Sequence, residues 1–83
     1  MDKKAIRAAV DEILDNQLRD NNPPETRQAL DRLQREGWTM DDSRKLIAQC
    51  IVVELFDILK NKRAFNEVRF LNNLKNLPVE PAE

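Results

Sequence analysis

Apolar residues recur along this chain at the three- and four-residue spacing of helices, in four separate segments. We predict helices over residues 2–19, 23–36, 40–60 and 67–77. No segment alternates apolar and polar residues in the manner of a strand. The expected fold class is therefore all-α, a compact bundle of four helices in which the short connections favour antiparallel neighbours.

Several predicted helix ends carry recognisable start and stop signals. Thr39 and Asn66 occupy positions where an N-cap side chain accepts a backbone N–H. Gly37 follows the second helix, where a left-handed residue commonly ends a helix. Asn22 is the expected cap of the second helix, with Pro23 at its first position. These signals predict helices joined by tight, capped turns.

The third predicted helix is apolar on two opposite sides. One side carries Ile47, Cys50, Ile51 and Ile58, and the other carries Val52, Phe56 and Leu59. A helix that is apolar on both sides has to be covered on both sides, so we predict that this helix is central. Three shorter helices are too few to cover it completely. Val52, Phe56 and Leu59 are therefore the candidate interface for a protein partner or for a second copy in a homodimer.

Glu54 lies in line with the core-facing residues of the third helix, and Gln17 interrupts the apolar stripe of the first. A buried carboxylate requires a hydrogen-bonding or charged partner, and Arg27 is an available cation. Together with Asp15, these residues form a candidate polar pocket between helices. The first interpretation of this pocket is a structural hydrogen-bonded network. The alternative is a site for a small ligand or a divalent cation.

Two further groups of residues are interpreted structurally. Lys60, Lys62 and Arg63 follow the third helix, where cations complement the negative end of the helix dipole. Cys50 stands among apolar residues without a basic neighbour to lower its pKa. We therefore expect Cys50 to be a packing residue.

Length and composition exclude several classes of protein. The 83 residues suit a single domain over residues 1–77, followed by a short disordered tail over residues 78–83 with two prolines and two acids. Fourteen Lys and Arg against fifteen Asp and Glu give a net charge of −1, so no nucleic-acid partner is expected. The chain has no His, which excludes histidine-dependent catalysis, and its one Cys excludes an intrachain disulfide. We expect no cofactor, no metal and no enzymatic activity.

No apolar run is long enough for a secretion signal or a membrane span. We therefore expect a cytoplasmic location and no membrane partner.

A series of short motifs runs through residues 9–77. It consists of Asn16-Gln17-Leu18, Pro24, Arg27, Leu30, Leu33, Gly37, Glu54-Leu55, Asp57 and Leu59. This order resembles a group of small bacterial helical domains of unknown function. In related sequences, His and Glu on the first and third helices suggest a metal or polar site. This chain carries Asp11, Asp15 and Lys45 at the corresponding places, so the resemblance implies no metal site here.

From these observations we expect a non-enzymatic protein-interaction module that self-associates as a homodimer. The alternative function is binding of a small ligand or a divalent cation in the candidate polar pocket.

Overall fold

A computed structural model describes residues 3–83 of the chain. It contains four helices, α1 (Lys3–Asp20), α2 (Pro24–Arg35), α3 (Met40–Asn61) and α4 (Glu67–Asn76), and no strand within the described residues. The all-α prediction is confirmed, and each predicted helix end that falls within residues 3–83 lies within one residue of the observed one. Residue 2, where the first predicted helix begins, lies outside the described residues.

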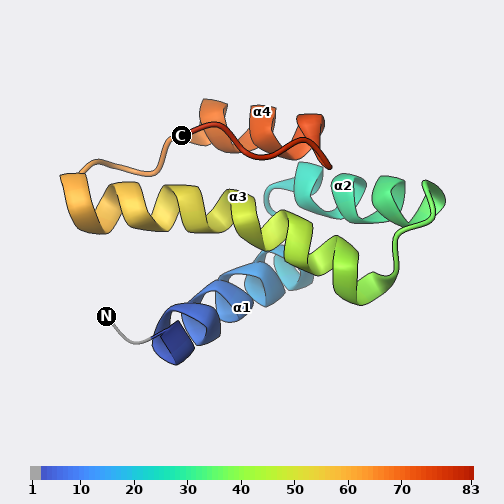
Figure 1. Cartoon of the computed structure of the whole chain (residues 1–83), viewed down its shortest axis with the longest axis horizontal. Coiled ribbons are helices and arrows are strands. Elements are labelled where there is room, and N and C mark those ends of the chain that lie inside the picture. Colours follow the sequence, from blue (N-terminus) through green and yellow to red (C-terminus); the bar gives the residue numbers. More distant parts are fainter. Residues whose placement is uncertain (1–2) are drawn as a thin grey trace.

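Helix α3 is the longest element and crosses the whole molecule (Figure 1), with α1 on one side and α2 and α4 on the other. It contacts all three other helices, whereas α1 and α4 do not contact each other in the described part of the chain. The prediction of a central third helix is therefore confirmed. Helix α3 has different neighbours on its two sides, so a side chain of α3 can contact only the helices that lie on its own side.

The core lies where the four helices converge on α3. Its members come from every helix and are nearly all aliphatic: Val10, Leu14, Ala29, Leu30, Leu33, Ile47, Cys50, Ile51, Phe70, Leu74 and Leu77. The C-terminal half of α3 extends past this core, and there Phe56 and Leu59 remain 48% and 46% exposed. The covering of α3 is thus complete over its core-facing side and incomplete on the flank that carries Phe56.

Three of the residues predicted to cap or end a helix do so in the structure. The Thr39 hydroxyl accepts from the Asp42 N–H at 3.0 Å, and the Asn66 amide oxygen accepts from the Arg69 N–H at 3.0 Å. Gly37, with φ of 102°, ends α2, and the Trp38 N–H then reaches back to the Leu33 carbonyl at 3.0 Å. This backward hydrogen bond is typical of a glycine-terminated helix.

The predicted start of α2 is wrong by one residue. Pro23, not Asn22, is the N-cap, and it makes no side-chain capping bond. The reason is that Pro23 itself precedes a proline, Pro24, and a residue in that position is held in the extended region, here with ψ of 151°. The Thr26 N–H bonds instead to the Pro23 carbonyl at 3.2 Å.

Residues 78–83 differ from the disordered tail that the sequence predicts. They form no regular secondary structure, but they lie back along α4 (Figure 1). The buried Asn73 side chain donates to the Ala82 carbonyl at 2.9 Å and accepts from the Ala82 N–H at 3.0 Å. A buried amide needs partners for both its donor and its acceptor, and the tail backbone supplies both.

Candidate functional site

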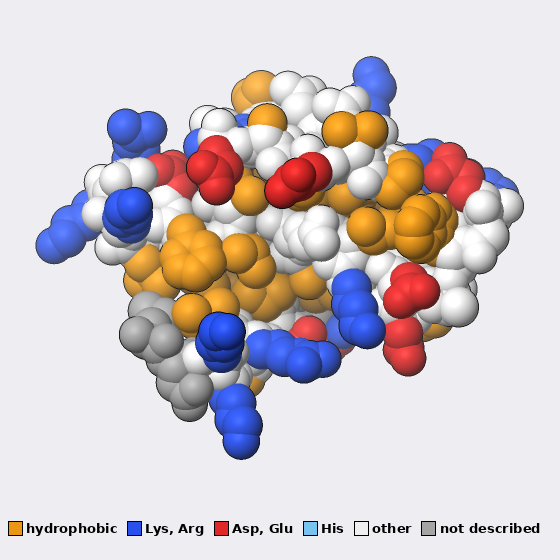
Figure 2. Space-filling model, in the orientation of Figure 1, with side chains coloured by type: hydrophobic (Ala, Val, Ile, Leu, Met, Phe, Trp, Pro, Cys, Tyr) orange, Lys and Arg blue, Asp and Glu red, His pale blue; other side chains and the backbone are white. Residues whose placement is uncertain are grey.

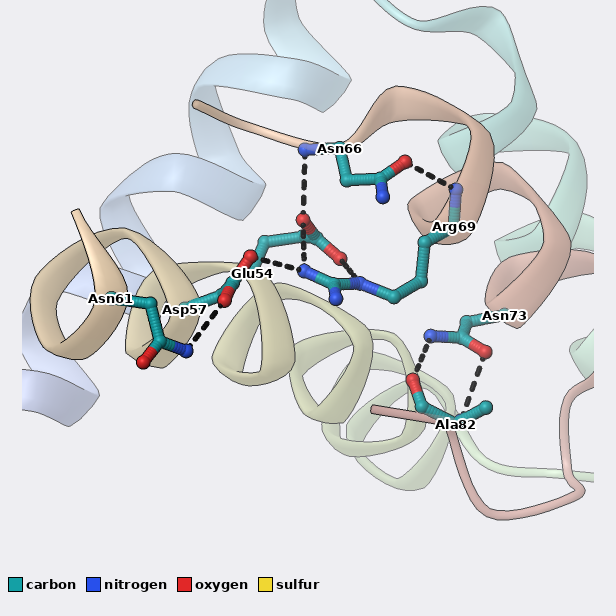
Figure 3. Close-up of polar contacts among 7 residues, drawn as sticks. All are labelled: Glu54, Asp57, Asn61, Asn66, Arg69, Asn73 and Ala82. Carbon is teal, nitrogen blue, oxygen red and sulfur yellow. Dashed lines mark hydrogen bonds and ion pairs between the residues drawn. The ribbon is translucent and has the colours of Figure 1, made fainter. Parts of the chain in front are cut away.

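The carboxylate of Glu54 is buried on α3, with only 1% of the residue exposed. It receives two hydrogen bonds from the guanidinium of Arg69 on α4, Nε to Oε2 at 2.6 Å and Nη2 to Oε1 at 2.9 Å. The backbone N–H of Asn66 donates a third, to Oε1 at 2.9 Å (Figure 3). Both carboxylate oxygens are therefore satisfied, as a buried charge requires.

The guanidinium of Arg69 also reaches a second carboxylate. Its Nη2 donates to Asp57 Oδ2 at 3.0 Å, and Asp57 Oδ1 accepts from the Asn61 amide at 2.8 Å (Figure 3). The hydrogen bonds from Asn61 and then Arg69 lower the pKa of Asp57. The hydrogen bonds to Glu54 and then Asp57 raise the pKa of Arg69. One cation thus pairs with two acids, and we call these four residues, together with Asn66, the Glu54 network.

The Glu54 network fastens the start of α4 to the C-terminal half of α3. Asn66 takes part twice, because its side chain caps α4 while its backbone N–H binds Glu54. Just before it, Phe65 packs edge-on against Phe70 with ring centroids 5.2 Å apart, in the manner of a hydrophobic staple. Both carboxylate oxygens of Glu54 are engaged in the hydrogen bonds with Arg69 and Asn66. The Glu54 network therefore serves as a structural link between α3 and α4.

The structure does not bring the four residues of the predicted polar pocket together. Gln17 Oε1 on α1 accepts from the Thr26 hydroxyl on α2 at 2.9 Å, while Glu54 turns toward α4, which α1 does not contact. Asp15 pairs with Arg44 at 2.6 Å, and Arg27 is exposed on α2. The predicted pocket is therefore wrong, because its members face different neighbours.

The interpretation of Glu54 as part of a buried hydrogen-bonded network is nevertheless confirmed, with other members. Sequence reasoning missed Arg69, Asn66 and Asp57. A usable signal was present in the sequence: Asp57 follows Glu54 by three residues and shares its side of α3. Arg69 lies in the first turn of a helix that begins shortly afterwards. Only the path of the loop at residues 62–66 shows that this turn folds back onto Glu54.

A groove of about 520 Å³ opens between α1 and α3, and no residue of α4 lines it. Its apolar lining consists of Ile6, Val10, Ala48, Val52 and Phe56. Its charged lining consists of Lys3, Arg7, Asp11, Arg44 and Lys45. Figure 2 shows apolar side chains gathered over the C-terminal half of α3 and toward α1, bordered below by Lys and Arg. We call this feature the α1–α3 groove.

The predicted interface residues lie on this side of α3 in part. Val52 and the half-exposed Phe56 line the α1–α3 groove, whereas the exposed Leu59 does not. The groove adds α1 residues that the pattern on α3 alone did not reveal, among them Ile6 and Val10. Two helices, and not one, therefore line the groove, with Ile6 partly exposed and Val10 buried.

The rim of the α1–α3 groove is positively charged. Four cations and a single acid, Asp11, line it. Arg44 is engaged by Asp15, but Arg7 and Lys45 form no ion pair within residues 3–83. The local charge thus contrasts with the net charge of −1 of the whole chain.

Cys50 is a packing residue, as predicted. It is fully buried, and its thiol makes only a weak hydrogen bond, 3.9 Å from sulfur to the Leu46 carbonyl oxygen. Burial raises the pKa of the Cys50 thiol to about 12. A buried thiol with a raised pKa has little of the thiolate character on which nucleophilic attack and metal binding depend.

Within residues 3–83, no group of three or more His, Cys, Asp or Glu side chains is arranged to hold a metal ion. None of the described helices combines the length and apolarity needed to cross a bilayer. No family model matches the chain, and comparisons with curated proteins and with solved structures find no match. The resemblance to small bacterial helical domains stays a prediction.

Proposed function

We propose that this chain is a non-enzymatic protein-interaction module that docks another protein on the α1–α3 groove. The observation that carries the proposal is the position of Phe56, a large apolar side chain left half exposed beside an apolar groove. Contiguous apolar surface of this kind, rimmed by polar residues, is typical of interaction sites.

The fold does not need Phe56 to complete its own core. Leu14, Ile47 and Phe70 are fully buried without it. An aromatic side chain buries on the order of 200 Å² when it is covered. Covering the exposed half of Phe56 would therefore contribute about 2 kcal/mol at roughly 25 cal/mol per Å². A partner that covers Phe56 would gain this free energy on binding, whereas the isolated chain leaves Phe56 uncovered.

The polar groups best placed for chemistry support a binding role over a catalytic one. Glu54, the most deeply buried acid among residues 3–83, already accepts three hydrogen bonds. The Cys50 thiol is buried with a raised pKa. Neither group lines the α1–α3 groove. The groove offers apolar contact area and positive charge, which are the ingredients of a protein interface.

A photo-crosslinking amino acid tests the proposal in the cells that make the protein. A benzophenone analogue of phenylalanine replaces Phe56 in one variant and the exposed Val68 of α4 in a control variant. We expect a discrete protein adduct from position 56 that position 68 does not give. Adding Ala48→Glu to the first variant places a charge in the groove, and we expect it to abolish the adduct while the helical circular dichroism is retained.

Two results would overturn the proposed function. One is the absence of a discrete adduct from position 56. The other is an adduct that persists with Ala48→Glu, because a partner seated elsewhere would not respond to a charge in the groove. The mass of an adduct separates a second copy of the chain from a different protein.

A further inference from the structure

We infer that the partner presents an acidic amphipathic helix to the α1–α3 groove. This inference rests on the proposed function and adds the chemical class of the partner. It follows from two independent properties of the groove, its shape and the charge of its rim.

The shape of the groove suits a helix. Its floor lies between two helices, and on α3 the lining residues Ala48, Val52 and Phe56 follow one another at four-residue steps. At about 1.5 Å per residue, the separation of eight residues between Ala48 and Phe56 spans roughly 12 Å, or a little over two turns. A partner helix laid along this length presents apolar side chains at i, i+3 or i+4, and i+7, which is the spacing used in helix-in-groove recognition.

The charge of the groove's rim indicates which residues should flank the apolar stripe of the partner helix. Arg7 on α1 and Lys45 on α3 are exposed on the two walls of the groove, and neither forms an ion pair within the described chain. Lys3 adds a further cation on the α1 wall. Glu or Asp residues on both sides of the partner's apolar stripe would meet these cations. Such complementarity raises the rate of association and the specificity of docking.

The same charges argue against a second copy as the occupant. In a two-fold homodimer the same surface meets itself, so each rim would face an identical rim. Such a dimer would place the cation-rich rim of one copy, with Arg7 and Lys45, against the same rim of the other, and one groove acid per chain, Asp11, would offset them. Like charges across an interface are unfavourable. The inferred occupant is therefore a different chain, and the homodimer expected from the sequence becomes an outcome of the test.

The experiment titrates the full chain with two synthetic helical peptides of equal length. Both carry the same leucine stripe, flanked by Glu in one peptide and by Lys in the other. Amide chemical shifts of the isotope-labelled protein report both the affinity and the site. We expect the Glu peptide to bind at least about tenfold more tightly at low salt, with shifts centred on Ala48 and Val52. Added salt should weaken its binding.

Charge-reversal variants test the rim. Arg7→Glu combined with Lys45→Glu should remove the preference for the Glu peptide or reverse it. Arg27→Glu, at an exposed position of α2 that does not line the groove, is the matched control. It should keep the preference, although it also makes the chain more negative.

Each other outcome overturns the inference in a recognisable way. Equal binding of the two peptides, or tighter binding of the Lys peptide, would contradict the acidic partner and leave the proposed docking function standing. Binding of neither peptide would contradict the helical acidic partner, and the crosslink from position 56 would then decide the docking function separately. Sedimentation equilibrium that shows a dimer abolished by Ala48→Glu would identify a second copy as the occupant.

Discussion

Glu54 and Arg69 stand fifteen residues apart and form a two-point ion pair between α3 and α4, with N–O distances of 2.6 and 2.9 Å. Helix α4 has only ten residues. Isolated helices of that length are marginal in water, so tertiary contacts must hold α4 in place. The buried ion pair does so at the N-terminal end of α4, where the apolar contacts of Phe70 begin.

Arg69→Met should strongly destabilise the fold, because it leaves the buried Glu54 carboxylate without its cation. Loss of one partner of a buried pair costs about 3–5 kcal/mol, a large part of the roughly 5–15 kcal/mol that stabilises a small domain. The double variant Glu54→Leu with Arg69→Met removes both charges and should recover most of the loss. Urea unfolding followed by circular dichroism measures both. A double variant less stable than Arg69→Met alone would contradict this coupling.

The contribution of Asp57 to stability should disappear in acid. Hydrogen bonds from Asn61 and Arg69 lower the pKa of Asp57 in the folded state, below the ordinary value of about 4 in the unfolded chain. The carboxylate therefore stabilises the fold above pH 4, and this stabilisation is lost as the pH falls through the lowered pKa. The difference in unfolding free energy between the wild type and Asp57→Asn should shrink accordingly.

Urea unfolding at neutral pH and at successive steps below pH 4 measures that difference. Asp31→Asn, at an exposed position of α2, is the control for simple removal of a negative charge. A gap between wild type and Asp57→Asn that stays constant as the pH falls would show that Asp57 does not act through its ionised form.

The sequence predicted the elements of this fold well, because helix period and capping residues are local properties. Thr39, Asn66 and Gly37 mark observed helix ends. The one displaced start, at α2, arises from two consecutive prolines, whose steric effect on each other outweighs the capping preference of Asn22.

The candidate site was predictable only in part, because its partners are joined by tertiary structure. The burial of Glu54 followed from its place on the wheel of α3. Its cation did not, because a choice among Arg27, Arg69 and other cations depends on which helix packs beside it. The α1–α3 groove was likewise predictable only in part. The pattern on α3 indicated Val52 and Phe56, whereas the contribution of α1 residues depended on how the two helices cross.

The Cys50 thiol should resist a disulfide reagent such as dithionitrobenzoate in the native protein. With a pKa of about 12, roughly one thiol in ten thousand is ionised at pH 8 in the folded chain, and the group is buried as well. In denaturing urea the pKa returns to about 8.5, and the thiol should react completely within minutes. Rapid reaction in the absence of denaturant would contradict the packing seen here.

The tail should detach when Asn73 loses its amide. Asn73→Ala removes both hydrogen bonds to Ala82 and leaves α4 otherwise intact. We expect faster amide hydrogen exchange at Ala82 and faster cleavage within residues 78–83 by a protease. Asn72→Ala, at an exposed neighbouring position, is the control and should leave both rates unchanged. Equal rates in the wild type and Asn73→Ala would show that these two bonds do not retain the tail.

Lys62→Gly should stabilise the protein by about 0.5–1 kcal/mol, since Lys62 ends α3 in the left-handed region with φ of 54°. A residue with a side chain has a steric cost in that region, and glycine does not. Removing this cost stabilises the fold by more than the greater conformational entropy of glycine in the unfolded chain destabilises it. Gly37→Ala is the opposite experiment. Gly37 has φ of 102° and open space where a Cβ would lie, so its substitution should destabilise through backbone strain alone. Thermal unfolding that fails to move the two variants in opposite directions would contradict these backbone assignments.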